Sequence, residues 1–263
     1  MPTTSARPFP ARDRTRRVWT EVNGVRTFAL VQGEGPPLVL VPGLAEAHFS
    51  FRELQTQLAD HFEVWAYDPP GHGYSRAPAD QFLSLESLAD HLAAWLRANR
   101  LEGVPLLGHS LGGDVLLHLA ARSPGSARCL VLCAPSSRPG LPGVLGPFLR
   151  LVAEAPKVRV TSLARLAWSF LHVGPCRTWR LLTHLRHADP RKVAPRVRVP
   201  TLILEGMDDG LVRLPGLRVM HSHLPNARLV RVPGASHLLI DDSSGKVARL
   251  VRVFALCAAP LSA

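Results

Sequence analysis

The sequence predicts an α/β fold with a doubly wound, mostly parallel sheet and a helical insertion. Short apolar runs, such as residues 38–41, suit strands that are buried on both faces. They alternate with amphipathic stretches, such as residues 83–99, whose apolar positions recur at helical spacing. The length of 263 residues suits one core domain with an insertion better than two catalytic domains.

The elements are expected in a regular order. The chain opens with an antiparallel hairpin, because residues 18–23 and 26–31 alternate around the turn Asn23-Gly24. Further strands are expected at residues 38–41, 62–67, 105–107, 129–133, 200–204 and 227–232. Helices are expected at residues 50–60, 83–99, 214–223 and 246–257, with one more between Ser110 and Ser123. Right-handed crossovers place the turns after the parallel strands at one edge of the sheet.

We divide the chain into three parts. Residues 1–17 carry five arginines and no apolar stretch, so we expect a disordered basic arm rather than a secretory signal. Residues 18–135 and 196–263 form the expected core. Residues 136–195 begin rich in proline and glycine and continue with helix-like stretches at residues 148–155, 163–172 and 178–187. We therefore expect residues 136–195 to form a helical cap on the sheet.

The net charge of +11 is concentrated in this insertion, because twelve basic and only two acidic residues lie from Arg138 to Arg198. Such a segment suits anionic substrates, an anionic membrane surface or nucleic acid, and a general arginine bias is the simpler alternative. Aromatic residues do not alternate with the basic ones as a base-stacking surface requires, so we expect no specific nucleic-acid partner. Peripheral contact with an anionic surface through the basic cap is an alternative that the sequence allows.

Cysteines and histidines indicate neither a disulfide framework nor a metal site. The four cysteines lack paired spacing, which favours a reduced, cytoplasmic setting. The pairs His184 with His187 and His221 with His223 have no third ligand nearby, so we expect no metal and no other cofactor. No stretch reaches the ~18 uninterrupted apolar residues of a membrane-spanning helix.

The rest of the chain is organised around an apolar run that ends in Gly108-His109-Ser110-Leu111-Gly112 and continues into an amphipathic stretch. It predicts a strand, a sharp turn and a helix, with Ser110 strained at the apex of the turn. Glycines are needed at 108 and 112, because Cβ atoms there would collide with neighbouring backbone. The N–H of Leu111 is then placed to stabilise an oxyanion beside the serine. A helix N-cap serine fits the bare pattern equally well, so the context decides.

A nucleophilic serine needs a histidine base, and that base needs an orienting carboxylate. Strand 200–204 runs into Asp208 and Asp209, and strand 227–232 runs into His237, so an acid and a histidine follow Ser110 in the required order. His237 is the expected base, and both aspartates stay candidates for the acid. His109 is expected to point away from Ser110 and to pack beside the elbow.

These motifs make the chain resemble the α/β-hydrolase fold enzymes of the esterase, lipase and haloperoxidase type. The resemblance covers residues 19–257 and rests on Val41-Pro42-Gly43-Leu44, Asp68-Pro69-Pro70-Gly71-His72-Gly73-Tyr74-Ser75, Gly108-His109-Ser110-Leu111-Gly112-Gly113, Gly206-Met207-Asp208-Asp209 and Gly234-Ala235-Ser236-His237. It implies Asp209 as the acid, with Asp208 as the fallback, and an oxyanion hole from the N–H groups of Leu44 and Leu111. The chain departs from the family at Pro42-Gly43, where relatives usually carry His-Gly, and this bears on the hydrogen bonds that hold the loop.

The activity implied is hydrolysis of a small carboxylic ester or related acyl compound through an acyl-enzyme on Ser110, without a cofactor. The same triad also supports cofactor-free haloperoxidation or perhydrolysis, carbon–carbon bond hydrolysis and acyl transfer. A non-enzymatic ligand-binding member of the fold is a further alternative, against which the intact serine, acid and histidine argue. The oligomeric state is not indicated by the sequence.

Substrate choice is expected to depend on the cap. Trp168, Phe170 and Trp179 are the substrate-binding candidates, because with Leu151 and Leu171 they supply apolar side chains for an acyl pocket. Internal packing of the cap is the alternative use of the same side chains.

Overall fold

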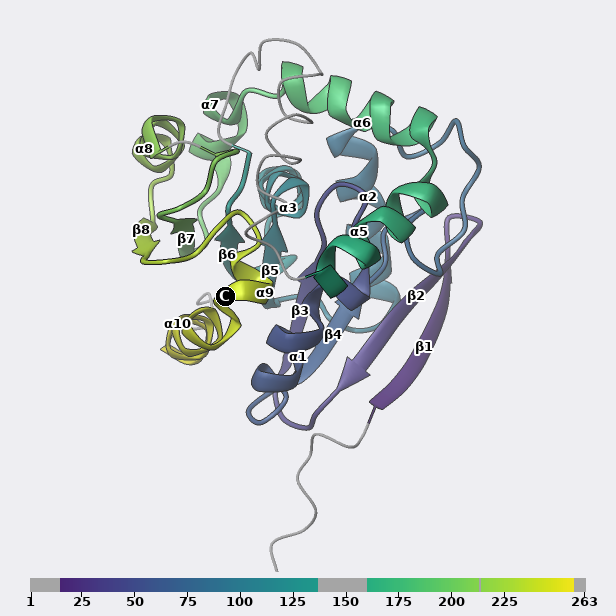
Figure 1. Cartoon of the computed structure of the whole chain (residues 1–263), viewed down its shortest axis with the longest axis horizontal. Coiled ribbons are helices and arrows are strands. Elements are labelled where there is room, and N and C mark those ends of the chain that lie inside the picture. Colours follow the sequence, from purple (N-terminus) through teal and green to yellow (C-terminus); the bar gives the residue numbers. More distant parts are fainter. Residues whose placement is uncertain (1–14, 137–159, 213, 258–263) are drawn as a thin grey trace, which may run out of the picture.

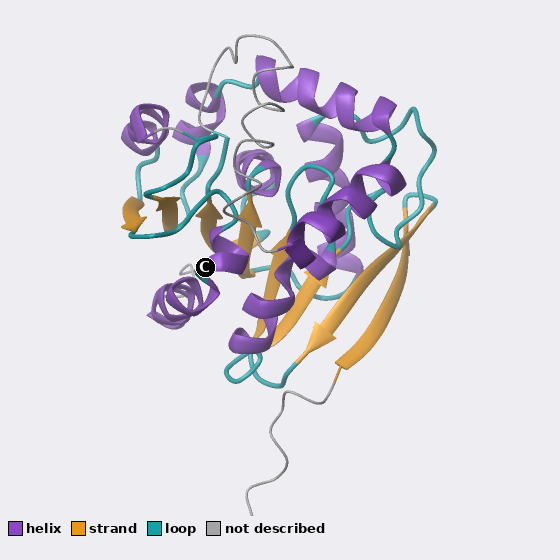
Figure 2. Cartoon of the chain, viewed as in Figure 1, coloured by secondary structure: helices purple, strands orange, loops and turns teal. Residues whose placement is uncertain are grey.

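The computed structural model describes residues 15–136, 160–212 and 214–257. Within these residues, one eight-stranded sheet has the strand order β1-β2-β4-β3-β5-β6-β7-β8 (Figure 1). β2 pairs antiparallel with β1 and β4, and all later neighbours are parallel. Helices cover both faces of the sheet (Figure 2). The predicted doubly wound, mostly parallel sheet is therefore confirmed.

The strands lie close to their expected positions. Their bounds are β1 Thr15–Val22, β2 Val25–Gln32, β3 Pro37–Val41, β4 Glu63–Tyr67, β5 Val104–His109, β6 Ala127–Cys133, β7 Thr201–Gly206 and β8 Ala227–Val232. The β1–β2 hairpin turns at Asn23 and Gly24, which both have positive φ, as an Asn-Gly turn requires.

The start of β1 corrects the expected boundary of the basic arm. Thr15 already pairs with Gln32 of β2, so residues 15–17 belong to the sheet and not to an arm over residues 1–17. The Arg16 guanidinium forms an ion pair with Glu63 of β4 and lies 5.1 Å from the ring centroid of Trp65. These contacts attach this end of the strand.

The helices also follow the sequence pattern where they are long. Their bounds are α1 Arg52–Leu58, α2 Leu85–Ala98, α3 Leu111–Arg122, α5 Val160–Val173, α6 Pro175–His187, α7 Pro190–Val193, α8 Leu214–His223, α9 Leu239–Asp242 and α10 Ser244–Cys257, with 3₁₀ turns η2 His48–Phe51 and η4 Ala194–Arg196. α7 and α9 have four residues each, too few for a periodic pattern. The helix expected at residues 148–155 lies outside the described residues. No helix in the described ranges is long and apolar enough to cross a membrane.

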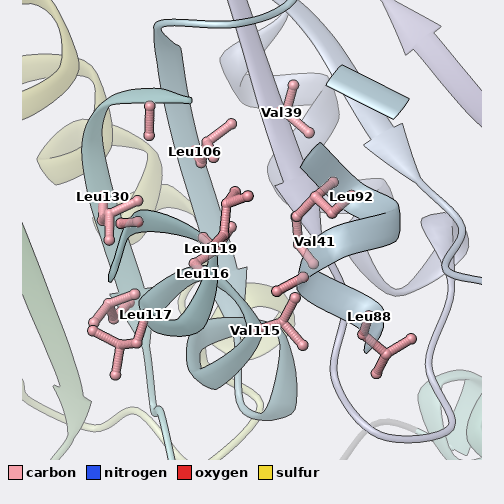
Figure 3. Close-up of a cluster of buried hydrophobic side chains, with 14 of the residues drawn as sticks. Val39, Val41, Leu88, Leu92, Leu106, Val115, Leu116, Leu117, Leu119 and Leu130 are labelled. Carbon is pink, nitrogen blue, oxygen red and sulfur yellow. The ribbon is translucent and has the colours of Figure 1, made fainter. Parts of the chain in front are cut away.

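Side chains that alternate along β3 separate two apolar cores. Val39 and Val41 belong to a core with α2 and α3, and Leu38 and Leu40 belong to a second core with α1 and α10. Figure 3 shows part of the first core, in which Leu88 and Leu92 of α2 and Val115 and Leu116 of α3 lie on the same face of the sheet as Val39 and Val41. Because both faces of β3 are buried, its sequence is apolar at every position from 38 to 41.

A buried cation joins α6 to the core. The Arg177 guanidinium donates hydrogen bonds to the carbonyl oxygens of Pro70, Ala77 and Pro78, and the residue is only 4% exposed. A Cβ at Gly71 would lie 1.9 Å from this guanidinium. The absence of a side chain at Gly71 therefore lets the loop lie against Arg177. The sequence pattern assigns Arg177 to the surface charge of the insertion, whereas it is a buried contact between α6 and the loop after β4.

Gly24 and Gly33 both have positive φ, but only Gly33 lies close to other backbone atoms. Gly33 and Gly24 have φ of +86° and +72°, but a Cβ at Gly33 would lie 2.4 Å from the Phe62 carbonyl oxygen, while nothing lies within 4 Å of one at Gly24. We expect Gly24→Ala to lower the free energy of unfolding by about 1 kcal/mol, because alanine is strained at positive φ.

We expect Gly33→Ala to cost about 2 kcal/mol more than Gly24→Ala, because the methyl group also overpacks against the backbone of Ala59 and Phe62. Equilibrium urea denaturation measures both losses. Equal losses in the two variants would contradict a role for this contact.

Candidate active site

Ser110 lies at the apex of the turn between β5 and α3. Its φ of +49° and ψ of −119° form a conformation that is strained for a residue with a side chain. Its N–H donates to the carbonyl oxygen of Cys133 at the end of β6 (2.9 Å). A Cβ on Gly112 would lie 2.2 Å from the Val41 carbonyl oxygen, and one on Gly108 would lie 2.5 Å from the Gly112 oxygen. Close backbone contacts therefore require both glycines, as expected.

Two further side chains meet Ser110 at the carboxyl edge of the sheet. Asp209 follows β7 and His237 follows β8, on the side of β5 that β6 occupies (Figure 1). His237 Nε2 lies 3.2 Å from Ser110 Oγ, and His237 Nδ1 lies 2.9 Å from Asp209 Oδ2. Since a carboxylate only accepts hydrogen bonds, Nδ1 donates to Asp209 and the lone pair of Nε2 is directed at the serine hydroxyl. The structure thus joins the three side chains in one chain of hydrogen bonds.

The hydrogen bonds distinguish Asp209 from Asp208. Asp209 Oδ1 accepts the N–H groups of Leu211 (2.7 Å) and Val212 (2.8 Å), which leaves Oδ2 for His237. Burial opposes ionisation of Asp209, but the charge and hydrogen bond of His237 and these two N–H groups hold the pKa of its carboxyl below the usual value. Asp208 is exposed, so Asp209 is the aspartate that orients His237.

The loop that carries His237 is held by a contact that the sequence pattern does not reveal. Asp242 Oδ2 accepts the Ser236 N–H (3.0 Å) and the Ser236 hydroxyl (2.5 Å). Asp242 belongs to α9, the short helix that is too short to predict from periodicity. This carboxylate holds Ser236, the residue before His237, and so restrains the loop that carries the histidine.

The loop after β3 lies against the serine. A Cβ at Gly43 would lie 3.2 Å from Ser110 Cβ, so the loop approaches Ser110 closely just before Leu44. Leu111 is the first residue of α3, where an N–H has no partner within its own helix. The two residues expected to supply the oxyanion hole, Leu44 and Leu111, therefore lie on two segments that flank Ser110.

Sequence comparisons identify the family of this chain. The model for the alpha/beta hydrolase fold family matches residues 36–171. The chain is also 31% identical over 235 residues to the pimeloyl-[acyl-carrier protein] methyl ester esterase of Chromobacterium violaceum, an alignment that covers 80% of this chain and 90% of that protein. The chain belongs to the alpha/beta hydrolase fold family. Three of its relatives are named as an esterase, a deformylase and a serine hydrolase, and the protein is a hydrolase.

Two further matches extend the comparison of this hydrolase. It is 30% identical over 270 residues to the polyketide synthase ThaQ of Burkholderia thailandensis, an alignment that covers 89% of this chain but only 13% of ThaQ. The solved enol-lactonase of Burkholderia xenovorans LB400 has a TM-score of 0.76 and 25% identity, and the match covers 90% of this chain and 99% of that one.

The hydrolase holds the loop after β3 with a carboxylate. Glu46 Oε2 accepts the Gly43 N–H (2.9 Å), and the same oxygen lies 2.9 Å from His109 Nδ1. His109 Nε2 lies 3.0 Å from the carbonyl oxygen of His237. His109 thus lies beside the elbow, as expected, and hydrogen bonds to Glu46 and to the His237 carbonyl oxygen hold it there. The sequence pattern missed Glu46, whose only local signal is a carboxylate three residues after Gly43.

The candidate substrate-binding residues differ in their surroundings. Trp168 contacts Phe49 edge to face, with ring centroids 5.5 Å apart, and stacks on His172 at 3.6 Å. Phe170 is partly buried, whereas Trp179 is 58% exposed. On α6, Arg177 and Leu181 face the core, so residue 179 lies on the opposite side of the helix. Substrate contact by the three residues stays a prediction.

An apolar hollow lies beside the elbow, and no residue of α5 or α6 is among those that line it. It is lined by Val41, Pro42, Tyr67, Pro69, His72, Leu88, Leu111 and Val115. Burial lowers the pKa of His72 to about 4, so its ring is neutral at pH 7. Within the described parts of the chain, no three His, Cys, Asp or Glu side chains are arranged to hold a metal ion.

Asp209→Asn should lower kcat about 10⁴-fold, because an amide at this position favours the wrong tautomer of the histidine. Asp208→Asn is the matched control and should stay within a few-fold of the wild type, since Asp208 is exposed. Steady-state hydrolysis of an activated ester measures both. A larger loss in Asp208→Asn would reassign the carboxylate.

A second buried carboxyl lies near the start of the insertion. Asp114 of α3 accepts hydrogen bonds from the N–H and the hydroxyl of Ser136, and it is 4% exposed. Burial raises the pKa of Asp114 to about 7, although these hydrogen bonds lower it in part.

This pKa predicts a pH-dependent stability difference. The folded state holds the Asp114 proton up to about pH 7 and the unfolded chain releases it near pH 4, so ionisation destabilises the fold as pH rises between these values. Relative to the wild type, Asp114→Asn should therefore gain about 2 kcal/mol of unfolding free energy from pH 5 to pH 8. Urea denaturation at both pH values measures the gain, and a constant difference would contradict it.

Proposed function

We propose that this hydrolase cleaves a carboxylic ester through an acyl-enzyme on Ser110. The observation that carries the proposal is the hydrogen-bonded chain from Ser110 Oγ to His237 Nε2 (3.2 Å) and from His237 Nδ1 to Asp209 Oδ2 (2.9 Å). The name of the Chromobacterium relative, a methyl ester esterase, favours an ester as the bond that is broken.

The first half of the proposed reaction forms the acyl-enzyme. His237 Nε2 takes the proton of the Ser110 hydroxyl as Oγ attacks the carbonyl carbon of the ester. The carbonyl oxygen becomes an oxyanion, which the N–H groups of Leu44 and Leu111 stabilise. The carbon–oxygen bond to the alcohol then breaks, and the imidazolium gives its proton to the leaving alkoxide.

The second half releases the acid. Water takes the place of the alcohol, His237 removes one of its protons, and the oxygen attacks the acyl carbon. The bond to Ser110 Oγ breaks, and the proton held by His237 returns to the serine. Asp209 stays ionised throughout and stabilises the imidazolium, which the depressed pKa of its carboxyl favours.

We also propose that α5 and α6 form the cap that selects the substrate. The contact between Trp168 of α5 and Phe49 of η2 supports this role, because η2 follows the loop of Gly43, Leu44 and Glu46 within a few residues. Exposed basic residues of α6 and α7, such as Arg180 and Lys192, suit a substrate or surface with negative charge.

Ser110→Ala should abolish hydrolysis of a short p-nitrophenyl ester and the covalent mass shift that a fluorophosphonate probe produces, because no other group replaces the nucleophile. Ser222→Ala is the control, since that hydroxyl lies at the exposed end of α8 and bonds only locally. Activity retained by purified Ser110→Ala, or a probe adduct on another residue of the wild type, would overturn the proposal.

A further inference from the structure

The pair formed by Glu46 and His109 lies behind the nucleophile, and no step of the proposed reaction uses it. The two side chains are 7% and 0% exposed, and Glu46 Oε2 lies 2.9 Å from His109 Nδ1. The ring of His109 is also 5.2 Å from that of His237, measured between centroids. The pair therefore lies beside the proposed base without touching Ser110 Oγ in the described contacts.

The hydrogen bonds require both ring nitrogens of His109 to carry protons when Glu46 is ionised. The His237 carbonyl oxygen only accepts, so Nε2 of His109 donates to it at 3.0 Å. Nδ1 faces a carboxylate oxygen that already accepts the Gly43 N–H, so Nδ1 donates as well. Burial opposes both charges, but their mutual attraction holds the pKa of Glu46 below and that of His109 above the usual value. Both directions favour the ionised pair over the neutral one.

An ion pair at this depth is a weak source of stability, because the loss of hydration offsets most of the attraction. What distinguishes this pair is the set of segments that it connects. Through Gly43 it holds the loop after β3, through His109 the end of β5, and through the His237 carbonyl the loop after β8. These segments carry Leu44, Ser110 and His237.

We propose that Glu46 and His109 are positioning residues for ester hydrolysis, and that their ion pair sets the oxyanion loop and the loop of His237 at the correct distance from Ser110. This inference rests on the proposed function. Because neither side chain touches the reacting atoms, the pair acts through Gly43 and the backbone of His237. A displacement of about 1 Å in such groups can cost on the order of 100-fold in rate.

The test compares Glu46→Gln, His109→Gln and the double variant with the wild type, using p-nitrophenyl ester hydrolysis and the rate of fluorophosphonate labelling at Ser110. Glutamine at 46 keeps the size of the side chain and an acceptor for Gly43 but removes the charge. We expect each single variant to lower kcat and the labelling rate on the order of 10- to 100-fold, with KM within about threefold, because the defect lies in alignment. The double variant should lose no more than the more damaged single variant, since the two residues act as a unit.

Thr27→Val is the matched control. Thr27 Oγ1 and His91 Nε2 form another buried hydrogen bond to a histidine (3.0 Å), between β2 and α2 and outside the site. This variant should lower the melting temperature but leave kcat and the labelling rate at wild-type values. Near-UV circular dichroism of every variant identifies any that do not fold, and each single variant tests the proposal by itself.

The outcomes separate the two proposals. Wild-type kcat and labelling in a folded Glu46→Gln or His109→Gln, with only a lower melting temperature, would overturn the positioning role and leave the proposed function intact. Losses that simply add in the double variant would also overturn it. A wild type that neither hydrolyses esters nor reacts with the probe would overturn the proposed function, and the positioning role with it.

Discussion

The close contact between α3 and the end of β3 determines where Ser110 stands. Gly112 passes so near the carbonyl group of Val41 that no side chain fits between them, and this fixes the first turn of α3 against the sheet. Ser110 must then adopt a backbone conformation that costs of order 1–3 kcal/mol, which only a rigid surrounding can hold. The hydrogen bond to Cys133 and the two apolar cores supply that rigidity. The other members of the site only have to reach a point that the sheet has already fixed.

Local pattern was sufficient to predict this framework. The central strand β3 is apolar from residue 38 to 41 because both of its faces are buried, and the long helices carry one apolar face, so the period of the sequence identifies these elements. The edge strand β8 is less buried and carries Arg228 and Arg231. The order of Ser110, Asp209 and His237 could also be predicted, because each follows a strand of the same parallel sheet. The chain outside the core was predicted less well: Thr15 already belongs to β1, and four-residue helices carry no periodicity.

The contacts that could not be predicted join polar residues distant in sequence. Glu46 and His109 are 63 positions apart, and Arg177 lies 107 positions from the Pro70 carbonyl group that it binds. A single charged residue in a sequence is ordinarily a solvated one, so nothing local marks Glu46 or Arg177 as buried. The choice between Asp208 and Asp209 is similar, because it depends on which carboxylate two N–H groups of the next turn can reach. The resemblance to the family, and not the spacing of charges, favoured Asp209.

The guanidinium of Arg177 restricts the movement of α6 relative to the core. It satisfies three carbonyl groups of the loop after β4, and it fills the space left by the missing side chain of Gly71. Separating α6 from the core would break these three hydrogen bonds from a charged donor, each of which contributes about 1.5–3 kcal/mol. α6 is therefore mechanically part of the rigid scaffold, although in sequence it belongs to the insertion. Any adjustment of the site to substrates of different size is therefore expected in segments that no such buried hydrogen bonds join to the core.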